Sequence, residues 1–378
     1  MTTFISPNFF QSKKSTYWIV ILLLFTLSCN QEPVKTQFKH QLKAGNTAIK
    51  GKVDHWPTDT VYFATFTFHS PYATTEGFQV VTPEKTFEFK FDQIDQPFIV
   101  FLTPERKFLD LRKDVLFENL TDKYYRGYCQ KFYDYPITTY LIEPGTETNV
   151  ELSKTKRYGK TAIKFLNANQ YNAAYYQSTF VLDQELDEVL DSRYDVKLKE
   201  LKNIDIAITN LNYTSQELLT KLAAEQPYIS PFLYKYTKAE IEFGAKKEFL
   251  RYLLLDHKAE ASKLFKSKIP EKIDQVIAFN KGEVDYATSI SQEYNEFLEL
   301  YINFKLSKQK KELITYKELD QEKFDLVLKE LPGASRYNYL ANNLLHLKYN
   351  EKARMLATTI IQLYPNGELN NKLLKKYE

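Results

Sequence analysis

The chain has 378 residues, with 51 Lys and Arg against 48 Asp and Glu, and a formal net charge of +3. So small an excess of positive charge creates no global field for a polyanion, which argues against a nucleic-acid partner. The hydrophobic fraction of 43% and the charged fraction of 26% are ordinary for a folded protein and argue against wholesale disorder.

Residues 1–28 have the form of a secretory signal peptide. A basic start precedes an apolar stretch that is too short to span a bilayer comfortably, and Ser28 stands directly before Cys29. Cleavage between them would free the thiol for a diacylglyceryl group, and several acyl chains hold a protein firmly on a membrane. The Leu-Ser-Cys ending resembles the lipobox of bacterial lipoproteins, although Thr26 stands where that motif usually has Leu. We expect lipidation at Cys29, with an uncleaved anchor helix as the alternative.

A polar segment, residues 29–43, follows the cleavage site and is interpreted as a flexible tether. Further along the chain, no stretch approaches the roughly 18 to 20 apolar residues that a spanning helix needs. The rest of the chain is therefore expected to be held outside the cytoplasm by its anchor. Its expected place is the cell envelope, on the periplasmic side or the outer surface, with the membrane as its first partner.

Residues 44–166 carry the pattern of β-strands joined by turns. Residues 86–92 alternate strictly, with three Phe on one face and charged residues on the other. Further β-rich apolar runs are residues 61–68 and 98–102. The Glu-Pro-Gly-Thr sequence at 143–146 predicts a tight turn. Because no helical period separates most of these runs, we expect an antiparallel β-sandwich-like domain rather than a parallel sheet.

Residues 104–135 interrupt this pattern with a segment dense in charged and aromatic residues. Its seven basic and six acidic residues nearly cancel, so it is not a phosphate-tracking stripe. One hypothesis is a binding loop on a rigid sheet. The other is a structural insertion that packs its rings on the domain. The candidate binding residues are Tyr124, Tyr125, Arg126, Tyr128 and Tyr133.

From about residue 170 the apolar period becomes helical. Three apolar stripes with steps of three and four lie in residues 182–201, 290–304 and 337–345. Such stripes are typical of helix-packing cores. Residues 349–365 look like one helix of a repeat hairpin, but no second copy supports a solenoid. We therefore expect residues 167–378 to form an all-α helical domain, which makes the fold class α+β.

The chemistry-bearing residues form no local catalytic pattern. After lipidation only Cys129 would remain as a thiol, and no Cys-x-x-Cys occurs, so dithiol exchange within this chain is not expected. The five histidines are scattered, without metal-ligand spacing, and no phosphate-binding loop or nucleophile elbow is present. We expect no catalytic residue, no metal site and no cofactor.

Three short sequences carry a resemblance to a known family. They are Ile-Lys-Gly-Lys-Val at 49–53, Leu-Ile-Glu-Pro-Gly-Thr at 141–146 and Asn-Ala-Asn-Gln-Tyr-Asn at 167–172, all behind a lipobox. Their order resembles the β-domain and helical linker of the TlpA-like thiol-disulfide oxidoreductase lipoproteins, over roughly residues 45–378. In that family a thioredoxin domain with a Trp-Cys-x-x-Cys sequence follows, and nothing in this chain matches it. The resemblance implies architecture and compartment, and it does not imply the redox activity.

These observations favour a membrane-anchored lipoprotein of the cell envelope that acts as a non-enzymatic binding or interaction module. One alternative is an accessory or truncated part of a thiol-disulfide system, with a separate thioredoxin-like protein or another envelope protein as partner. The other alternative is a glycan-binding lipoprotein that uses the Tyr-rich loop. No nucleic-acid partner is expected.

Overall fold

The computed structural model describes residue 38 and residues 44–66, 75–104, 106, 138–154, 161–165, 202–251, 253–254, 263–267, 269–315 and 318–378. Strands come first and helices follow, so the fold is mixed, as the sequence predicts. The strands are β1 (Gly45–Asp54), β2 (Thr60–Phe66), β3 (Thr75–Val80), β4 (Thr86–Ile94), β5 (Phe98–Thr103), β6 (Thr138–Ile142), β7 (Glu147–Lys154) and β8 (Thr161–Phe165).

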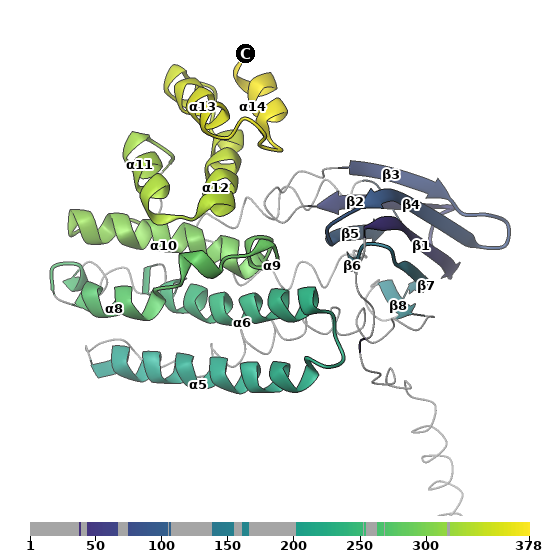
Figure 1. Ribbon diagram of the computed structural model, residues 1–378, viewed down its shortest axis with the longest axis horizontal. Helices are drawn as coiled ribbons and strands as arrows, with labels where there is room; N and C mark the ends of the chain where they lie inside the picture. Colours follow the sequence, from purple (N-terminus) through teal and green to yellow (C-terminus); the bar gives the residue numbers. More distant parts are fainter. Residues whose placement is uncertain are drawn as a thin grey trace, which may run out of the picture. The chain divides into compact units, whose positions relative to one another are not determined.

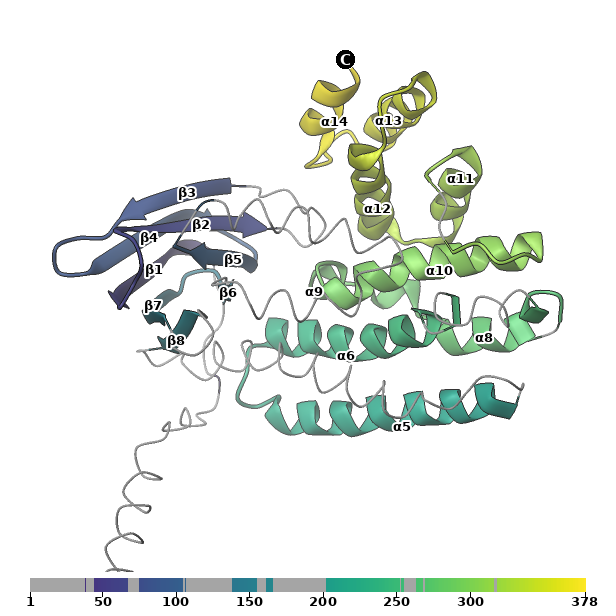
Figure 2. The same cartoon turned by 180° about the vertical axis from the view of Figure 1, so that it is seen from behind.

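The helices begin with α5 (Lys202–Glu225), α6 (Pro231–Arg251) and α8 (Ile269–Ile277), followed by the 3-10 turn η2 (Lys281–Glu283), α9 (Tyr286–Ser289) and α10 (Gln292–Lys310). The last four are α11 (Gln321–Glu330), α12 (Gly333–His346), α13 (Glu351–Leu363) and α14 (Asn370–Tyr377). In Figures 1 and 2, α5, α6 and α10 lie side by side as layers of one bundle, while α12, α13 and α14 form a second group.

The strands that the structure describes form two four-stranded sheets. The first sheet has the order β4-β1-β7-β8 and the second the order β3-β2-β5-β6. All but one of the strand pairs are antiparallel, whereas β1 and β7 are parallel. The prediction of an antiparallel domain is therefore wrong for the first sheet, which is mixed.

The turn at residues 143–146 explains this difference. Gly145 has a φ of 68°, as the predicted turn requires. The turn does not fold β7 back onto β6, because β6 ends in the second sheet and β7 enters the first. There β7 lies beside β1, and the backbone N–H of Ala48 donates to the carbonyl of Thr146 at 3.1 Å. Alternation predicts that a strand exists, but it does not predict the sheet to which the strand belongs.

The predicted alternation in β4 is confirmed. Phe87 and Phe89 are buried, while Glu88 and Lys90 point to the opposite face. Gly51 lies opposite Phe87 on β1, and a Cβ at this glycine would come within 2.3 Å of the Phe87 ring. The Phe87 ring thus packs directly on the backbone of β1, in the space that a side chain at Gly51 would fill.

One buried cluster draws side chains from both sheets. From the first sheet it includes Ile49, Val53, Phe87, Phe89, Val150 and Leu152, and from the second Val61, Val100, Leu102 and Ile142. The face of the first sheet that points away from this cluster is called the outer face below.

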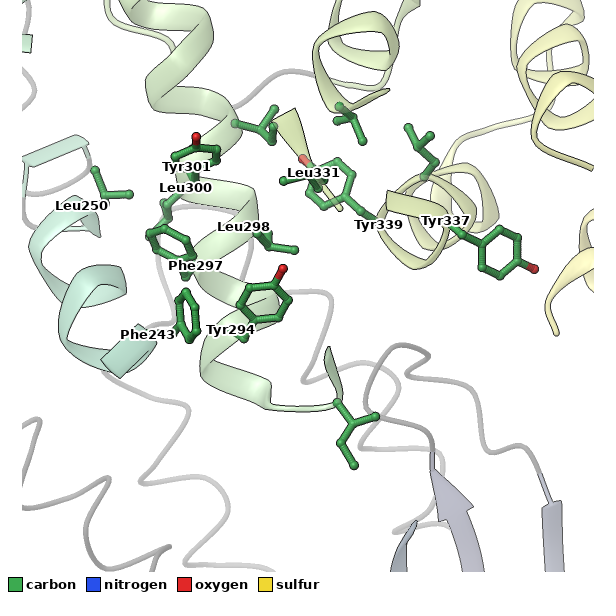
Figure 3. Close-up of a cluster of buried hydrophobic side chains, with 14 of the residues drawn as sticks. Phe243, Leu250, Tyr294, Phe297, Leu298, Leu300, Tyr301, Leu331, Tyr337 and Tyr339 are labelled. Carbon is green, nitrogen blue, oxygen red and sulfur yellow. The ribbon is translucent and has the colours of Figure 1, made fainter. Parts of the chain in front are cut away.

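The helices share a larger core, and the predicted stripes at residues 290–304 and 337–345 lie in it. In α10, Tyr294, Phe297 and Phe304 are fully buried, and Figure 3 shows Tyr294 and Phe297 beside Phe243 of α6. The ring centroids of Phe243 and Tyr294 are 4.7 Å apart in an edge-on arrangement. The stripe at residues 337–345 is buried in α12. The stripe at residues 182–201 lies outside the described residues.

Glu143 joins the strands to the helices. Its carboxylate is buried and accepts a hydrogen bond from the Oγ of Ser230. Ser230 in turn accepts from the backbone N–H of Leu233, at 3.0 Å, and so caps the start of α6. A carboxylate is favourable at this place because the first turn of a helix presents unpaired N–H groups.

Candidate functional site

The residues singled out from the sequence lie outside the part of the chain that the structure describes. This holds for the lipidation candidate Cys29 and for Cys129. It holds also for the candidate binding loop, Tyr124, Tyr125, Arg126, Tyr128 and Tyr133. These assignments therefore remain predictions.

Among the described residues, a hollow of about 750 Å³ opens on the outer face of the first sheet and is lined by β4, β1, β7 and the end of β3. We call it the sheet hollow. Its polar lining comprises Lys50, Lys52, Gln79, Thr82, Thr86, Glu88, Lys90 and Asn149. Its apolar lining comprises Gly51, Val80, Phe87 and Val150.

Strand register decides which polar side chains meet in the sheet hollow. Lys50 of β1 is paired with Glu88 of β4 on one side and with Asn149 of β7 on the other. Lys52, two residues further along β1, is paired with Thr86 on one side and with Glu151 of β7 on the other. Because side chains two apart on a strand point to the same face, about 7 Å from each other, these residues form adjacent rows on the outer face.

Lys50 stands at the centre of this arrangement. Its Nζ lies 2.6 Å from Oε2 of Glu147 and 3.6 Å from Oε1 of Glu88. The hydrogen bond to Glu147 raises the pKa of Lys50 and lowers the pKa of Glu147. Both side chains are well exposed, so water screens the pair and its contribution to stability is small. The pair can therefore open at little cost.

The sheet hollow has more positive than negative side chains. Lys50, Lys52 and Lys90 line it, against the one carboxylate of Glu88. Glu88 is shared, since its Oε2 lies 3.5 Å from Nζ of Lys90 while its Oε1 faces Lys50. The lining is thus rich in hydrogen-bond donors, and it suits a ligand that supplies acceptors and negative charge.

A second group of charged residues is buried between α6 and α10. Nζ of Lys247 lies 2.6 Å from Oε2 of Glu293 and 3.3 Å from Oε2 of Glu296. Glu240 is buried, and it accepts from Oγ of Ser291 at 2.5 Å and from the backbone N–H of Glu293 at 3.3 Å. Burial, which opposes the ionised form, raises the pKa of Glu240 to about 7. We interpret this cluster as structural, because its members pair with each other across two packed helices.

A third group, of buried charged and polar residues, links α10 to α11 by an ion pair and to α12 by a hydrogen bond. Nζ of Lys323 is fully buried and lies 2.8 Å from Oε1 of Glu299. The other carboxylate oxygen of Glu299 accepts from the hydroxyl of Tyr339. A buried ammonium with a close carboxylate is costly to break, because removing one partner leaves the other charge buried alone.

The described residues contain no group of three or more His, Cys, Asp and Glu that could hold a metal ion. Within the same residues, none of the helices combines the length and the apolar character that crossing a membrane requires.

No protein-family profile matches the sequence, and no curated protein matches it either.

The sequence did contain a signal for the sheet hollow. Lys50 and Lys52 alternate with apolar residues in β1, as Glu88 and Lys90 do in β4. Alternation alone assigns such residues to a solvated face. The hollow arises because β1 and β4 pair in a register that sets the rows side by side, and this pairing is not visible in either segment.

Proposed function

We propose that the protein is a lipid-anchored lipoprotein of the bacterial cell envelope and that its mature part is a non-enzymatic binding module. The anchor is proposed from the basic start, the short apolar stretch and the Leu-Ser-Cys sequence that ends at Cys29. The observation that carries the binding role is the sheet hollow, an open, donor-rich surface on a rigid sheet.

We further infer that the two sheets pack face to face as a β-sandwich. The support is the buried cluster to which both sheets contribute, with inward and outward side chains alternating along β1 and β4. This architecture, followed by helices, is compatible with the proposed relation to the β-domain and helical linker of the TlpA-like lipoproteins. We propose that relation for the architecture alone.

The binding role is tested by the reactivity of lysines in intact cells. Reductive methylation would be compared between cells and the purified full chain, with peptide mass spectrometry as the readout. If a ligand occupies the sheet hollow in the envelope, Lys50 and Lys52 should be protected in cells. Lys352, an exposed lysine of α13, is the matched control and should react equally in both samples. Equal reactivity of Lys52 in both samples would contradict the binding role.

An accessory role in a thiol-disulfide system is the second candidate. It predicts that this chain accelerates the reduction of insulin by a separate thioredoxin-like protein, while the chain alone, with no dithiol of its own, shows no turnover. The third candidate, glycan binding through the Tyr-rich loop, predicts weaker oligosaccharide binding after Tyr124→Ala or Tyr128→Ala.

A further inference from the structure

We propose that the sheet hollow binds a linear acidic polysaccharide whose sugars carry carboxylate groups. This inference rests on the proposed binding role and names the class of ligand. It involves Lys50, Lys52 and Lys90 together with the hydroxyl and amide side chains beside them.

The charge of the lining sets the first requirement on the ligand. Three ammonium groups face one lining carboxylate, that of Glu88. Two carboxylates outside the lining offset part of this charge: Glu147 is bound to Lys50, and Glu151 of β7 is paired with Lys52. Lys52 lies one row further along β1 and adds a second positive group to the same strand face. A ligand that supplies carboxylates replaces exposed lysine–glutamate pairs, which are individually weak.

The spacing of the lysines sets the second requirement. Lys50 and Lys52 are two residues apart on one strand, about 7 Å along its axis. Lys90 lies on the neighbouring strand, paired with Ala48, so it stands one row further in the opposite direction. The Cα atoms of the three lysines are therefore distributed along the strand direction, and the ammonium groups of Lys50 and Lys90 lie on the two oxygens of the same carboxylate, that of Glu88. Such a row matches negative charges repeated along a chain better than it matches a single compact anion.

The remaining side chains favour a saccharide over other linear polyanions. Gln79 and Asn149 present amide groups that both donate and accept, as the hydroxyls of a sugar require. The hydroxyls of Thr82 and Thr86 are hydrogen-bonded to each other at 2.8 Å, and each oxygen keeps acceptor capacity beyond that bond. Single-stranded nucleic acid is bound largely by stacking of bases on exposed aromatic rings. The one aromatic ring of the lining, Phe87, is only 4% exposed and offers no such platform.

The test is binding of the purified full chain to immobilised polygalacturonate, followed by biolayer interferometry over a range of salt concentrations. The wild-type chain should bind saturably, and less tightly as salt rises. Neutral dextran should not bind. Lys52→Ala and Lys50→Ala should each weaken binding roughly fivefold or more. Glu88→Gln should strengthen binding, because it removes the carboxylate that competes with the ligand for two lysines.

Lys352→Ala is the control and should bind as the wild type does. All substituted residues are solvent-exposed or half-exposed, and circular dichroism would verify that each variant folds. Three results would overturn the assignment: no saturable binding to polygalacturonate, binding that Lys52→Ala leaves unchanged, or equal affinity for inorganic polyphosphate, which would mean that charge alone is recognised. If the lysines are protected in cells but polygalacturonate does not bind, the binding role stands and the ligand class is wrong.

Discussion

Replacement of Glu240 by Gln should remove a pH dependence from the stability of the helical bundle. Glu240 is buried between α6 and α10, and its pKa is raised from 4.5 to about 7 by loss of solvent. Hydrogen bonds from Ser291 and from the backbone N–H of Glu293 favour the ionised form, as does the charge of Lys247, but burial outweighs them. Glu296 acts in the same direction as burial, since its negative charge opposes ionisation.

The direction of the pH dependence follows from the pKa of Glu240 in the unfolded chain, 4.5, and in the folded chain, about 7. Between pH 4.5 and about 7 the folded chain keeps the proton on Glu240, whereas the unfolded chain has lost it. The folded state then binds more protons, so its stability falls as the pH rises through this window and levels off above it. The difference between 4.5 and about 7, at about 1.4 kcal/mol for each pH unit, gives about 3 kcal/mol.

The Gln side chain has no proton to lose, and its carbonyl can still accept from Ser291 and from the N–H of Glu293. The variant should therefore match the wild type near pH 4.5 and exceed it by up to about 3 kcal/mol at pH 8. The assay is urea unfolding of both chains at several pH values, followed by helical circular dichroism, and titrating groups that do not interact with Glu240 cancel in the difference. A wild-type chain that gains stability over the variant as the pH rises would refute the reasoning, because it would mean that Glu240 is ionised and held by Lys247.

Three further substitutions test the packing of the helical part by the same urea assay. Lys323→Met should cost about 3 to 5 kcal/mol, because it leaves the buried carboxylate of Glu299 without its ammonium partner. Gly367→Ala should cost about 1 to 3 kcal/mol, because the new Cβ would lie 2.3 Å from the ring of Tyr337. Ser230→Ala should cost about 1 to 2 kcal/mol, because α6 loses its cap and a buried carboxylate loses a donor.

Matched controls separate these effects from general sensitivity to substitution. Lys310→Ala breaks an ion pair of 2.8 Å with Glu322 that is well exposed, so it should cost less than about 1 kcal/mol. Gly333→Ala places a Cβ where nothing lies within 4 Å, so it should be neutral or slightly stabilising. A loss for either control that equals the loss for its buried counterpart would contradict the account.

Local sequence patterns predicted where strands and helices lie better than they predicted which strands pair with each other. The alternation at residues 86–92 corresponds to β4, and the apolar stripe at 290–304 corresponds to α10. The parallel pairing of β1 with β7 was missed, because the residues that meet there are far apart in the chain, as are Lys50 and Glu147. Register across such distances depends on tertiary packing, which a local pattern does not encode.

The buried charges were missed for a related reason. α6 is buried on several sides between α5 and α10, so it shows no single apolar stripe. Glu240 and Lys247 look like residues of a solvated face when the helix is considered alone. Their burial becomes visible only once α10 brings Ser291 and Glu293 against them. The sheet hollow was missed in the same way, because its rows come from different strands.

The proposed lipid anchor at Cys29 would place this protein in the cell envelope, and incorporation of radiolabelled palmitate tests it most directly. Cells that express the wild-type chain should incorporate the label into the protein, whereas cells that express Cys29→Ser should not. Absence of label from the wild-type chain, or equal labelling of the Cys29→Ser chain, would contradict the assignment to the envelope as a lipoprotein.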